Sequence, residues 1–196
     1  MMDARTRLWV GLGNPGAAYA AHRHNVGFMA VDRIAQAFAF DPWRARFSGL
    51  FAEGRIGAEK LMLLKPQTFM NESGQAVRRA VDFFKLMPAD VTVFYDELDL
   101  APGRVKVKTG GGAAGHNGIR SITAHIGPDF HRVRIGIGHP GHKDRVLGHV
   151  LSEFAKTDRE WVGDTLDAVA AEVPWLVASD AARFMSEVAR RTGDES

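Results

Sequence analysis

The sequence predicts an α/β fold: one domain across residues 1–196, built on a mixed, mostly parallel twisted sheet with helices on both faces and further helices at the C-terminus. Short apolar runs typical of strands alternate along the chain with segments of helical spacing. At 196 residues and 45% apolar composition, the chain supports one well-buried core. Two strand-like runs within residues 47–64 predict an antiparallel hairpin at the sheet edge, which makes the sheet mixed.

The first half of the chain gives four elements. Leu8–Leu12 is a short apolar strand that leads into a glycine-rich turn. Val26–Phe38 carries apolar residues at helical spacing, which predicts a helix. Phe47–Ile56 and Leu61–Leu64 have the pattern of strands. The second is nearly all apolar, as expected of a central strand buried on both faces.

The second half continues the alternation. A helix at Val77–Leu86 is ended by Pro88, and Val91–Tyr95 is another buried strand. After it we expect, in order, a strand at Val105–Lys108, a helix at Asn117–His125 and a strand at Val133–Ile137. The segment beyond Val150 has the apolar spacing of terminal helices.

Composition removes several classes of protein. The chain has no cysteine, so disulfides, thiolate metal sites and a cysteine nucleophile are excluded. No apolar run approaches the ~20 residues of a membrane helix, and the first residues lack the pattern of a signal peptide. We therefore expect a soluble cytoplasmic protein without a membrane partner.

Charge is unevenly distributed, although the net charge is only +2. From Arg104 to His149 there are eight lysines and arginines against two acids, and six of the eight histidines fall there too. The tail from Val150 has ten acids against five bases. Such a basic segment is typical of a face that binds a polyanion such as nucleic acid. Ordinary solvated side chains give the same counts, so charge alone does not decide.

The turn Gly11-Leu12-Gly13-Asn14-Pro15-Gly16 has the G-x-G-x-x-G spacing of a dinucleotide-binding loop. Two features argue against a nucleotide cofactor, and hence against an oxidoreductase. Pro15 removes one of the backbone N–H donors that a pyrophosphate needs. The nearest acid for a ribose, Asp32, lies inside the predicted helix and not at the end of a strand. Asn14 is then either a turn-stabilising asparagine or a functional amide at a strand end.

Four polar clusters lie where predicted strands end, and in open α/β sheets binding sites form beyond the carboxyl ends of strands. They are residues 19–25 (YAAHRHN), 65–71 (KPQTFMN), 95–100 (YDELDL) and 110–118 (GGGAAGHNG). Each has an ordinary explanation: Asn71 as a helix cap, Asp96 as a turn acid, and His24 and His116 as surface histidines. Convergence of the clusters on one cleft is the functional alternative.

In order along the chain, VGLGNPG…Y…RHNVG, KPQTFMN.SG, YDELDL.PG, GGG..GHNG and RIGIGHP resemble the motifs of bacterial peptidyl-tRNA hydrolases. The resemblance runs from about Leu8 to about Val150, and five ordered motifs make it far more specific than the glycine spacing alone. Ala113-Ala114 differs from some family members, which have His-Gly there, so the detail of that loop stays open. The family consists of single-domain α/β hydrolases that cleave the ester between a peptide and the 3′ end of tRNA.

The motifs of other hydrolases are missing. No serine stands in a G-x-S-x-G elbow, so covalent catalysis finds little support. There is no H-E-x-x-H, and His139-Pro140-Gly141-His142 lies in a predicted turn, so we expect neither a metal nor a cofactor. The reaction then needs an activated water, a group that orients the base, and donors for the oxyanion.

The resemblance assigns the catalytic roles. It implies that His24 takes a proton from water and that Asp96 accepts from the other ring nitrogen, which sets the tautomer. It also implies that the side-chain amides of Asn14, Asn71 and Asn117 bind substrate carbonyls and the water.

The resemblance further implies how the substrate is held. Tyr19 and Phe69 form walls for the peptide and the terminal adenosine, although Phe69 has a core role as an alternative. His116, in the GHNG motif, is grouped with the substrate-binding residues. Lys108 and Arg134 clamp the 5′-terminal phosphate of the tRNA.

Two alternatives concern the basic strands and the activity itself. Alternation puts Arg132 on the same strand face as Arg134, and a solvated strand face is the ordinary explanation of both. A non-catalytic RNA-binding protein of the same fold is the second functional class. The presence of His24, Asp96, Asn14 and Asn71 favours the enzyme, which we expect to be a monomer.

Overall fold

The computed structural model describes residues 5–194 and contains one seven-stranded sheet with the strand order β2-β3-β4-β1-β5-β7-β6. The parallel centre consists of β4 (Glu59–Pro66), β1 (Arg7–Gly11), β5 (Val91–Glu97) and β7 (His131–Gly136). Antiparallel strands flank it on both sides: β2 (Arg44–Arg46) and β3 (Gly49–Ile56) next to β4, and β6 (Val105–Thr109) next to β7. The predicted mixed sheet with a parallel core is confirmed.

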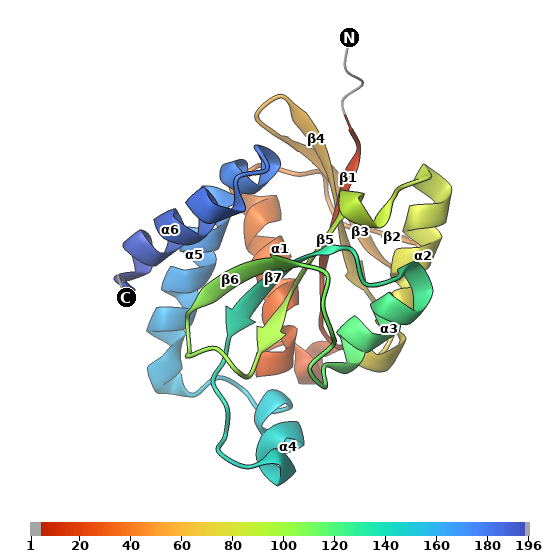
Figure 1. Ribbon diagram of the computed structural model, residues 1–196. Coiled ribbons are helices and arrows are strands. Elements are labelled where there is room, and N and C mark those ends of the chain that lie inside the picture. The colour runs from red at the N-terminus through yellow and green to blue at the C-terminus, as the bar shows by residue number, and fades with distance from the viewer. Residues whose placement is uncertain (1–4, 195–196) are drawn as a thin grey trace.

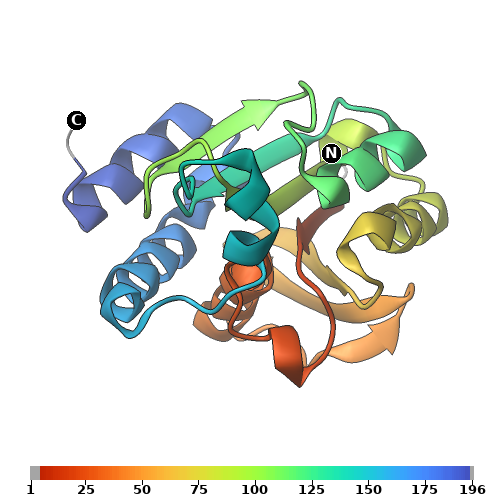
Figure 2. The same ribbon diagram turned by 90° about the horizontal axis from the view of Figure 1, so that it is seen from below.

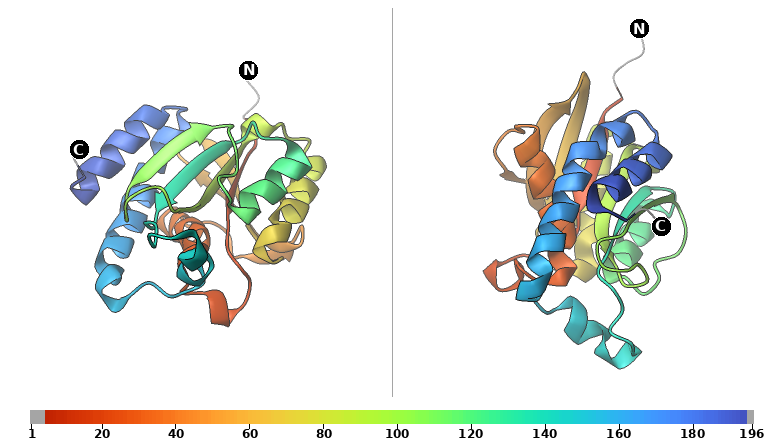
Figure 3. Two further views of the ribbon diagram at one scale, coloured as in Figure 1. Left: turned by 60° about the horizontal axis from the view of Figure 1, so that its bottom comes forward. Right: turned by 90° about the vertical axis from the view of Figure 1, so that its left-hand side faces the viewer.

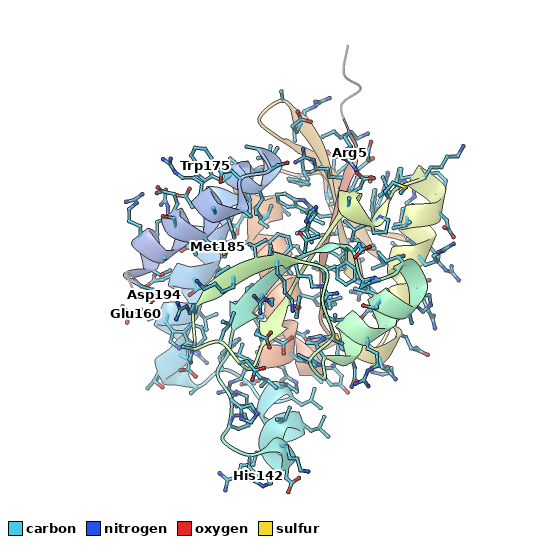
Figure 4. All side chains as sticks on the ribbon, in the orientation of Figure 1. Arg5, His142, Glu160, Trp175, Met185 and Asp194 are labelled. Carbon is cyan, nitrogen blue, oxygen red and sulfur yellow. The ribbon has the colours of Figure 1, made fainter. Side chains whose placement is uncertain are left out.

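Helices cover both faces of the sheet (Figure 1). On one face lie α1 (Val26–Ala37), α5 (Arg159–Val177) and α6 (Ala181–Thr192), and on the other α2 (Ser73–Phe84) and α3 (Asn117–Ile126). Alternate residues of β1, β4 and β5 enter opposite cores, as the period of two requires, so Trp9 packs in the first and Val10 in the second. At the outer edge, Met185 of α6 lies against β6 (Figure 4), where its Sδ accepts the Val107 N–H at 3.3 Å.

The parallel strands all end at the pole of the molecule where α4 (Val146–Val150) lies. Figure 2 looks onto this pole: α4 is central, with α5 and α6 to one side and α2 and α3 to the other. The right-hand view of Figure 3 shows α4 projecting below the sheet. Within residues 5–194, no helix has the length and apolar character needed to cross a membrane.

One predicted strand is two strands in the structure. The sequence predicts a continuous strand over Phe47–Ile56, whereas β2 ends at Arg46 and β3 starts at Gly49. Phe47 and Ser48 have φ values of 56° and 55°, and they form the two-residue turn between these strands. A phenylalanine is unfavourable there. Its ring packs against aromatic side chains of β3 and α2, and this tertiary packing outweighs the local preference.

The helix predicted at Val77–Leu86 begins one turn earlier, at Ser73. A glycine near a helix start resembles a loop in sequence, but Gly74 is the point where α2 contacts α3. A Cβ on Gly74 would lie 2.3 Å from the Ser121 carbonyl oxygen, so a glycine is required for the two helices to pack.

The GLGNPG turn also serves close packing. A Cβ on Gly11 would lie 2.4 Å from the Gly27 carbonyl oxygen, and one on Gly27 would lie 2.2 Å from that of Phe94. β1, α1 and β5 therefore approach more closely than any side chain allows. Two short 3₁₀ helices separate the turn from α1, so it does not lead directly into an α-helix as a dinucleotide loop does. Asp32 lies on α1, where it pairs with Lys65 at 2.6 Å.

Candidate active site

The end of β5 carries a carboxylate between two imidazoles. Asp96 is 3% exposed; its Oδ2 lies 2.8 Å from His24 Nδ1, and its Oδ1 lies 2.8 Å from His116 Nε2. His24 comes from the 3₁₀ helix η2 (Arg23–Asn25), which leads into α1, whereas His116 caps α3 on the opposite face of the sheet. The strand end therefore joins side chains from both helical layers. Neither histidine is an ordinary surface residue.

The pKa values at this centre follow from burial and from the opposite charges. Burial would raise the pKa of the Asp96 carboxyl, but the imidazoles of His24 and His116 hold it well below its usual range. Burial would lower the pKa of His24. The charge of Asp96 and its hydrogen bond outweigh that effect, so the pKa of His24 lies above the usual 6.5. The carboxylate is ionised, and it stabilises a proton on His24.

The open nitrogen of His24 defines what the pair does. In the neutral imidazole, Nδ1 carries the proton because it contacts the Asp96 carboxylate. Nε2 is then the nitrogen with a free lone pair. Nε2 has no hydrogen-bond partner within residues 5–194, and 12% of the His24 side chain is exposed. An imidazole oriented by a buried carboxylate, with its other nitrogen open, is the arrangement of a general base.

Asn14 stands at the end of β1 with its side-chain amide fixed in orientation. Its Oδ1 accepts from the N–H of Met70, in the 3₁₀ helix η3 (Met70–Glu72), at 2.8 Å. The Nδ2 group is thereby turned away as a hydrogen-bond donor. Asn25 holds the backbone of Asn14 with two hydrogen bonds of 2.9 Å, one accepted and one donated. This network links the ends of β1 and β4 to the segment that carries His24.

The other predicted substrate-binding side chains lie at the surface. Phe69 is 57% exposed, and its ring meets that of Tyr19 edge-on with centroids 6.5 Å apart, so a core role for Phe69 is wrong. Asn71 is exposed in η3, and within the described residues it makes no hydrogen bond that caps α2. Asn117 is exposed at the start of α3, and its Oδ1 accepts from Arg120 at 3.3 Å.

Arg132 contradicts the alternative of a solvated strand face. It is fully buried, and its guanidinium donates to the carbonyl oxygens of Gly112 at 2.6 Å, Gly111 at 2.8 Å and Pro128 at 3.1 Å. Alternation along a strand cannot distinguish burial by an overlying loop from exposure, and the glycine-rich loop covers this residue. Arg132 therefore anchors the loop that leads to His116.

Lys108 and Arg134 lie on the same face of the sheet as Arg132. In the antiparallel pairing of β6 with β7, Lys108 stands opposite Arg132. Arg134 lies 3.6 Å from Glu97, and no other carboxylate within residues 5–194 pairs with these three cations. Burial lowers the pKa of Lys108, and the positive charges of Arg134 and Arg132 lower it further. The result is a cluster of like charges with a single counter-charge.

Two residues that hold the site were not singled out as functional in the sequence. Asn25 is one, and the RHN motif is the signal that contains it. The other is Arg23, which donates to Ser152 Oγ at 2.6 Å and to the Glu153 carbonyl at 2.9 Å. Arg23 thereby ties the turn that carries His24 to the segment between α4 and α5. It also lines a cavity of about 640 Å³ beside that segment, which does not include His24.

One group among the described residues has the composition of a metal site. The possible ligand atoms of His24, Asp96 and His116 lie within 4.8 Å of one another. The hydrogen bonds described above already engage both Asp96 oxygens and one nitrogen of each histidine.

Comparison with known proteins places this chain in a family. The family model for peptidyl-tRNA hydrolase matches residues 8–195. The peptidyl-tRNA hydrolase of Rhizorhabdus wittichii is 63% identical over 188 residues, which cover 96% of this chain and 100% of the relative. That of Sphingopyxis alaskensis is also 63% identical, over 185 residues, 94% of this chain and 98% of the relative.

Solved structures agree with the sequence comparison. The crystal structure of peptidyl-tRNA hydrolase from Acinetobacter baumannii is 41% identical and has a TM-score of 0.89, covering 94% of this chain and 95% of that one. A complex of peptidyl-tRNA hydrolase with N-propanol is 42% identical, with a TM-score of 0.88 over 93% of this chain and 94% of that one. With motifs, fold and full-length identity in agreement, the chain belongs to the peptidyl-tRNA hydrolase family.

Proposed function

We propose that this protein hydrolyses the ester bond between a peptide, or an N-blocked aminoacyl group, and the 3′ end of tRNA, which releases the tRNA for reuse in translation. The observation that carries the proposal is the His24–Asp96 pair at the end of β5, with Nδ1 on the carboxylate and Nε2 open. The family match over residues 8–195 supplies the substrate class.

The reaction follows from the protonation states at this pair. A water molecule attacks the ester carbonyl carbon while Nε2 of His24 takes one of its protons. The negative charge of Asp96 stabilises the imidazolium that forms. The tetrahedral intermediate then expels the ribose oxygen, which takes the proton back from His24. The products are a free peptide carboxyl group and a tRNA with an intact 3′ hydroxyl.

Asn14 supplies the donor that the developing charge requires. Since Met70 N–H occupies its Oδ1, the Nδ2 group donates and therefore suits a carbonyl oxygen of the substrate. Asn71 and Asn117, exposed on neighbouring elements, provide further amides for the peptide backbone and the water. Tyr19 and Phe69 form an aromatic wall on which the peptide and the terminal adenosine pack.

The cation cluster of β6 and β7 suits the 5′-terminal phosphate of the tRNA. Lys108 and Arg134 lie on one face, Arg134 Nε is buried without a hydrogen-bond partner within residues 5–194, and Glu97 is the single counter-charge. Burial lowers the pKa of Lys108 most, and the positive charges of Arg134 and Arg132 lower it further; a phosphate would offset those charges. Lys108 pairs with Arg132, which stands opposite Val93 of β5, three residues before Asp96, whereas Arg134 stands opposite Tyr95, one residue before Asp96. The proposed phosphate site therefore begins beside the end of β5 that carries Asp96 and extends back along β7 and β6.

The test is release of free tRNA from N-acetylated aminoacyl-tRNA, followed on an acidic gel with no added metal or cofactor. We expect release by the wild type and almost none by His24→Ala at the same concentration. Binding of the substrate by the wild type without release would contradict the enzyme and favour a non-catalytic RNA-binding protein.

A further inference from the structure

Asp96 contacts two histidines at equal distances, but the two imidazoles are not equivalent. Each is 2.8 Å from a separate oxygen of the carboxylate, and the ring centroids lie 5.0 Å apart. The difference lies at the far nitrogen of each ring. Nε2 of His24 is open, whereas Nδ1 of His116 accepts from the backbone N–H groups of Gly118 at 3.1 Å and Ile119 at 3.3 Å.

This capping contact determines where the proton of His116 resides. A ring nitrogen that accepts from backbone N–H groups carries no proton, so the hydrogen of His116 is on Nε2 and is donated to Asp96 Oδ1. A second proton would break both capping bonds and would place a cation at the positive end of the α3 dipole. The rings of Tyr95 and His116 pack in a T-shaped contact with centroids 5.1 Å apart, which restricts rotation of the imidazole.

We propose that His116 is a positioning residue for the catalytic pair: a neutral imidazole, held as the Nε2–H tautomer by the N-terminus of α3, that orients Asp96 toward His24. The proposal rests on the proposed function. It differs from the substrate-binding role that the family resemblance implies for His116, because both ring nitrogens are already engaged. Since Asp96 and the cap of α3 engage both ring nitrogens of His116, His24 is the imidazole of this pair that keeps an open nitrogen within the described residues.

The same contacts couple the glycine-rich loop to the chemistry. Arg132 holds the carbonyl oxygens of Gly111 and Gly112, and the loop then continues to His116 at the start of α3. Displacement of this loop would remove the Nε2–H donor from Asp96 and leave the contact with His24 as the remaining side-chain hydrogen bond that orients the carboxylate within the described residues.

The direct test is the tautomer of each histidine in the ¹⁵N-labelled wild-type protein, measured by long-range ¹H–¹⁵N correlation at slightly alkaline pH. We expect opposite tautomers in one spectrum: the proton on Nε2 for His116 and on Nδ1 for His24. His116→Gln and His24→Ala assign the signals. A proton on Nδ1 of His116, or on both its nitrogens, would overturn the proposal. If His116 has the expected tautomer but His24 carries its proton on Nε2, the result would instead contradict the proposed role of His24 as the base.

A pair of substitutions separates the two contacts of His116. His116→Gln keeps a side-chain N–H that reaches Asp96 but not the cap, whereas His116→Asn keeps a good capping acceptor and loses the donor to Asp96. We expect His116→Asn to lower kcat by about 10- to 100-fold with little change in KM, as losses of such supporting contacts do. His116→Gln should retain most of the activity.

His125→Asn, at the other end of α3, is the matched control and should leave kcat unchanged. A His116→Asn enzyme with normal kcat and a raised KM would indicate substrate binding and overturn the proposal. Equal losses of kcat in the Asn and Gln variants would do the same. If neither variant folds, the wild-type tautomers still decide.

Discussion

The catalytic centre and the β6–β7 edge use charge in opposite ways. At the centre, buried Asp96 is matched by two imidazoles at 2.8 Å, and each group has a defined partner. At the edge, Lys108, Arg132 and Arg134 lie together with Glu97 as the single counter-charge within residues 5–194. A balanced, fixed network suits proton transfer, which depends on geometry. An unbalanced cluster suits a polyanion, which supplies the missing charge.

The pKa values of His24 and Lys108 differ from their usual values for opposite electrostatic reasons. An opposite charge raises the pKa of His24 against the effect of burial, whereas neighbouring like charges add to burial in lowering the pKa of Lys108. We therefore expect substitutions at the centre to change turnover and substitutions at the edge to change affinity.

The largest effect should come from His24→Ala. Loss of the general base should lower kcat by roughly two to four orders of magnitude, while substrate affinity changes little. Single-turnover hydrolysis and equilibrium binding of N-blocked aminoacyl-tRNA measure the two quantities. His139→Ala, an exposed histidine outside the site, is the control. Near wild-type turnover in His24→Ala would remove this residue from the mechanism.

Asp96→Asn should keep the fold and lower kcat by roughly 10²- to 10⁴-fold, because the base loses its orientation and the charge that stabilises its protonated form. The pH profile gives a second readout. Activity requires neutral His24, so kcat/KM of the wild type should fall as the pH drops through a pKa above 6.5. In Asp96→Asn the carboxylate is gone, so burial lowers the pKa of His24 without an opposing charge from Asp96. The fall of kcat/KM at acidic pH should therefore move to lower pH. An unchanged rate and pH profile would show that the two residues do not act as a pair.

The sequence predicted much of the centre, because its residues stand in short ordered motifs directly after buried strands. Asp96 follows the apolar run of β5, and Asn14 follows that of β1, so their place at the carboxyl end of the sheet follows from topology. The contacts of His116 could not be predicted, since they depend on the path of the glycine-rich loop across one face. Burial of Arg132 depends on the same path.

The turn at Phe47 likewise depends on contacts between residues distant in sequence, which a local pattern does not predict. An aromatic residue in a run of strand-like residues predicts a continuous strand, whereas contacts with α2, distant in sequence, stabilise a left-handed turn there.

Asn14→Asp should reduce the preference for blocked substrates. The wild type should strongly prefer a substrate whose α-amino group is blocked, since the Asn14 donor meets a carbonyl oxygen and repels a free ammonium group. The aspartate keeps an oxygen for Met70 N–H but has no amide donor. We expect the ratio of kcat/KM for blocked over free aminoacyl-tRNA to fall about tenfold, the scale of one hydrogen bond. Equal hydrolysis of both substrates by the wild type would defeat this assignment.

One measurement tests most directly whether the centre controls chemistry and the edge controls affinity. It compares the wild type, Lys108→Ala and Arg134→Ala on substrates that carry or lack the 5′-phosphate. Half-saturation concentration and maximal single-turnover rate are determined separately at several salt concentrations. Lys60→Ala, on β4 at the side of the parallel centre opposite to β7, removes the same charge and serves as the control.

If the edge binds the phosphate, each variant should raise half-saturation by up to about tenfold for the phosphorylated substrate only and reduce the salt slope by about one. The maximal rate should stay within about twofold of the wild type, since His24 and Asp96 are untouched. Two results would contradict this division of chemistry and affinity between the two regions. In the first, the variants still distinguish the two substrates as strongly as the wild type does. In the second, they lose maximal rate while the half-saturation concentration is unchanged.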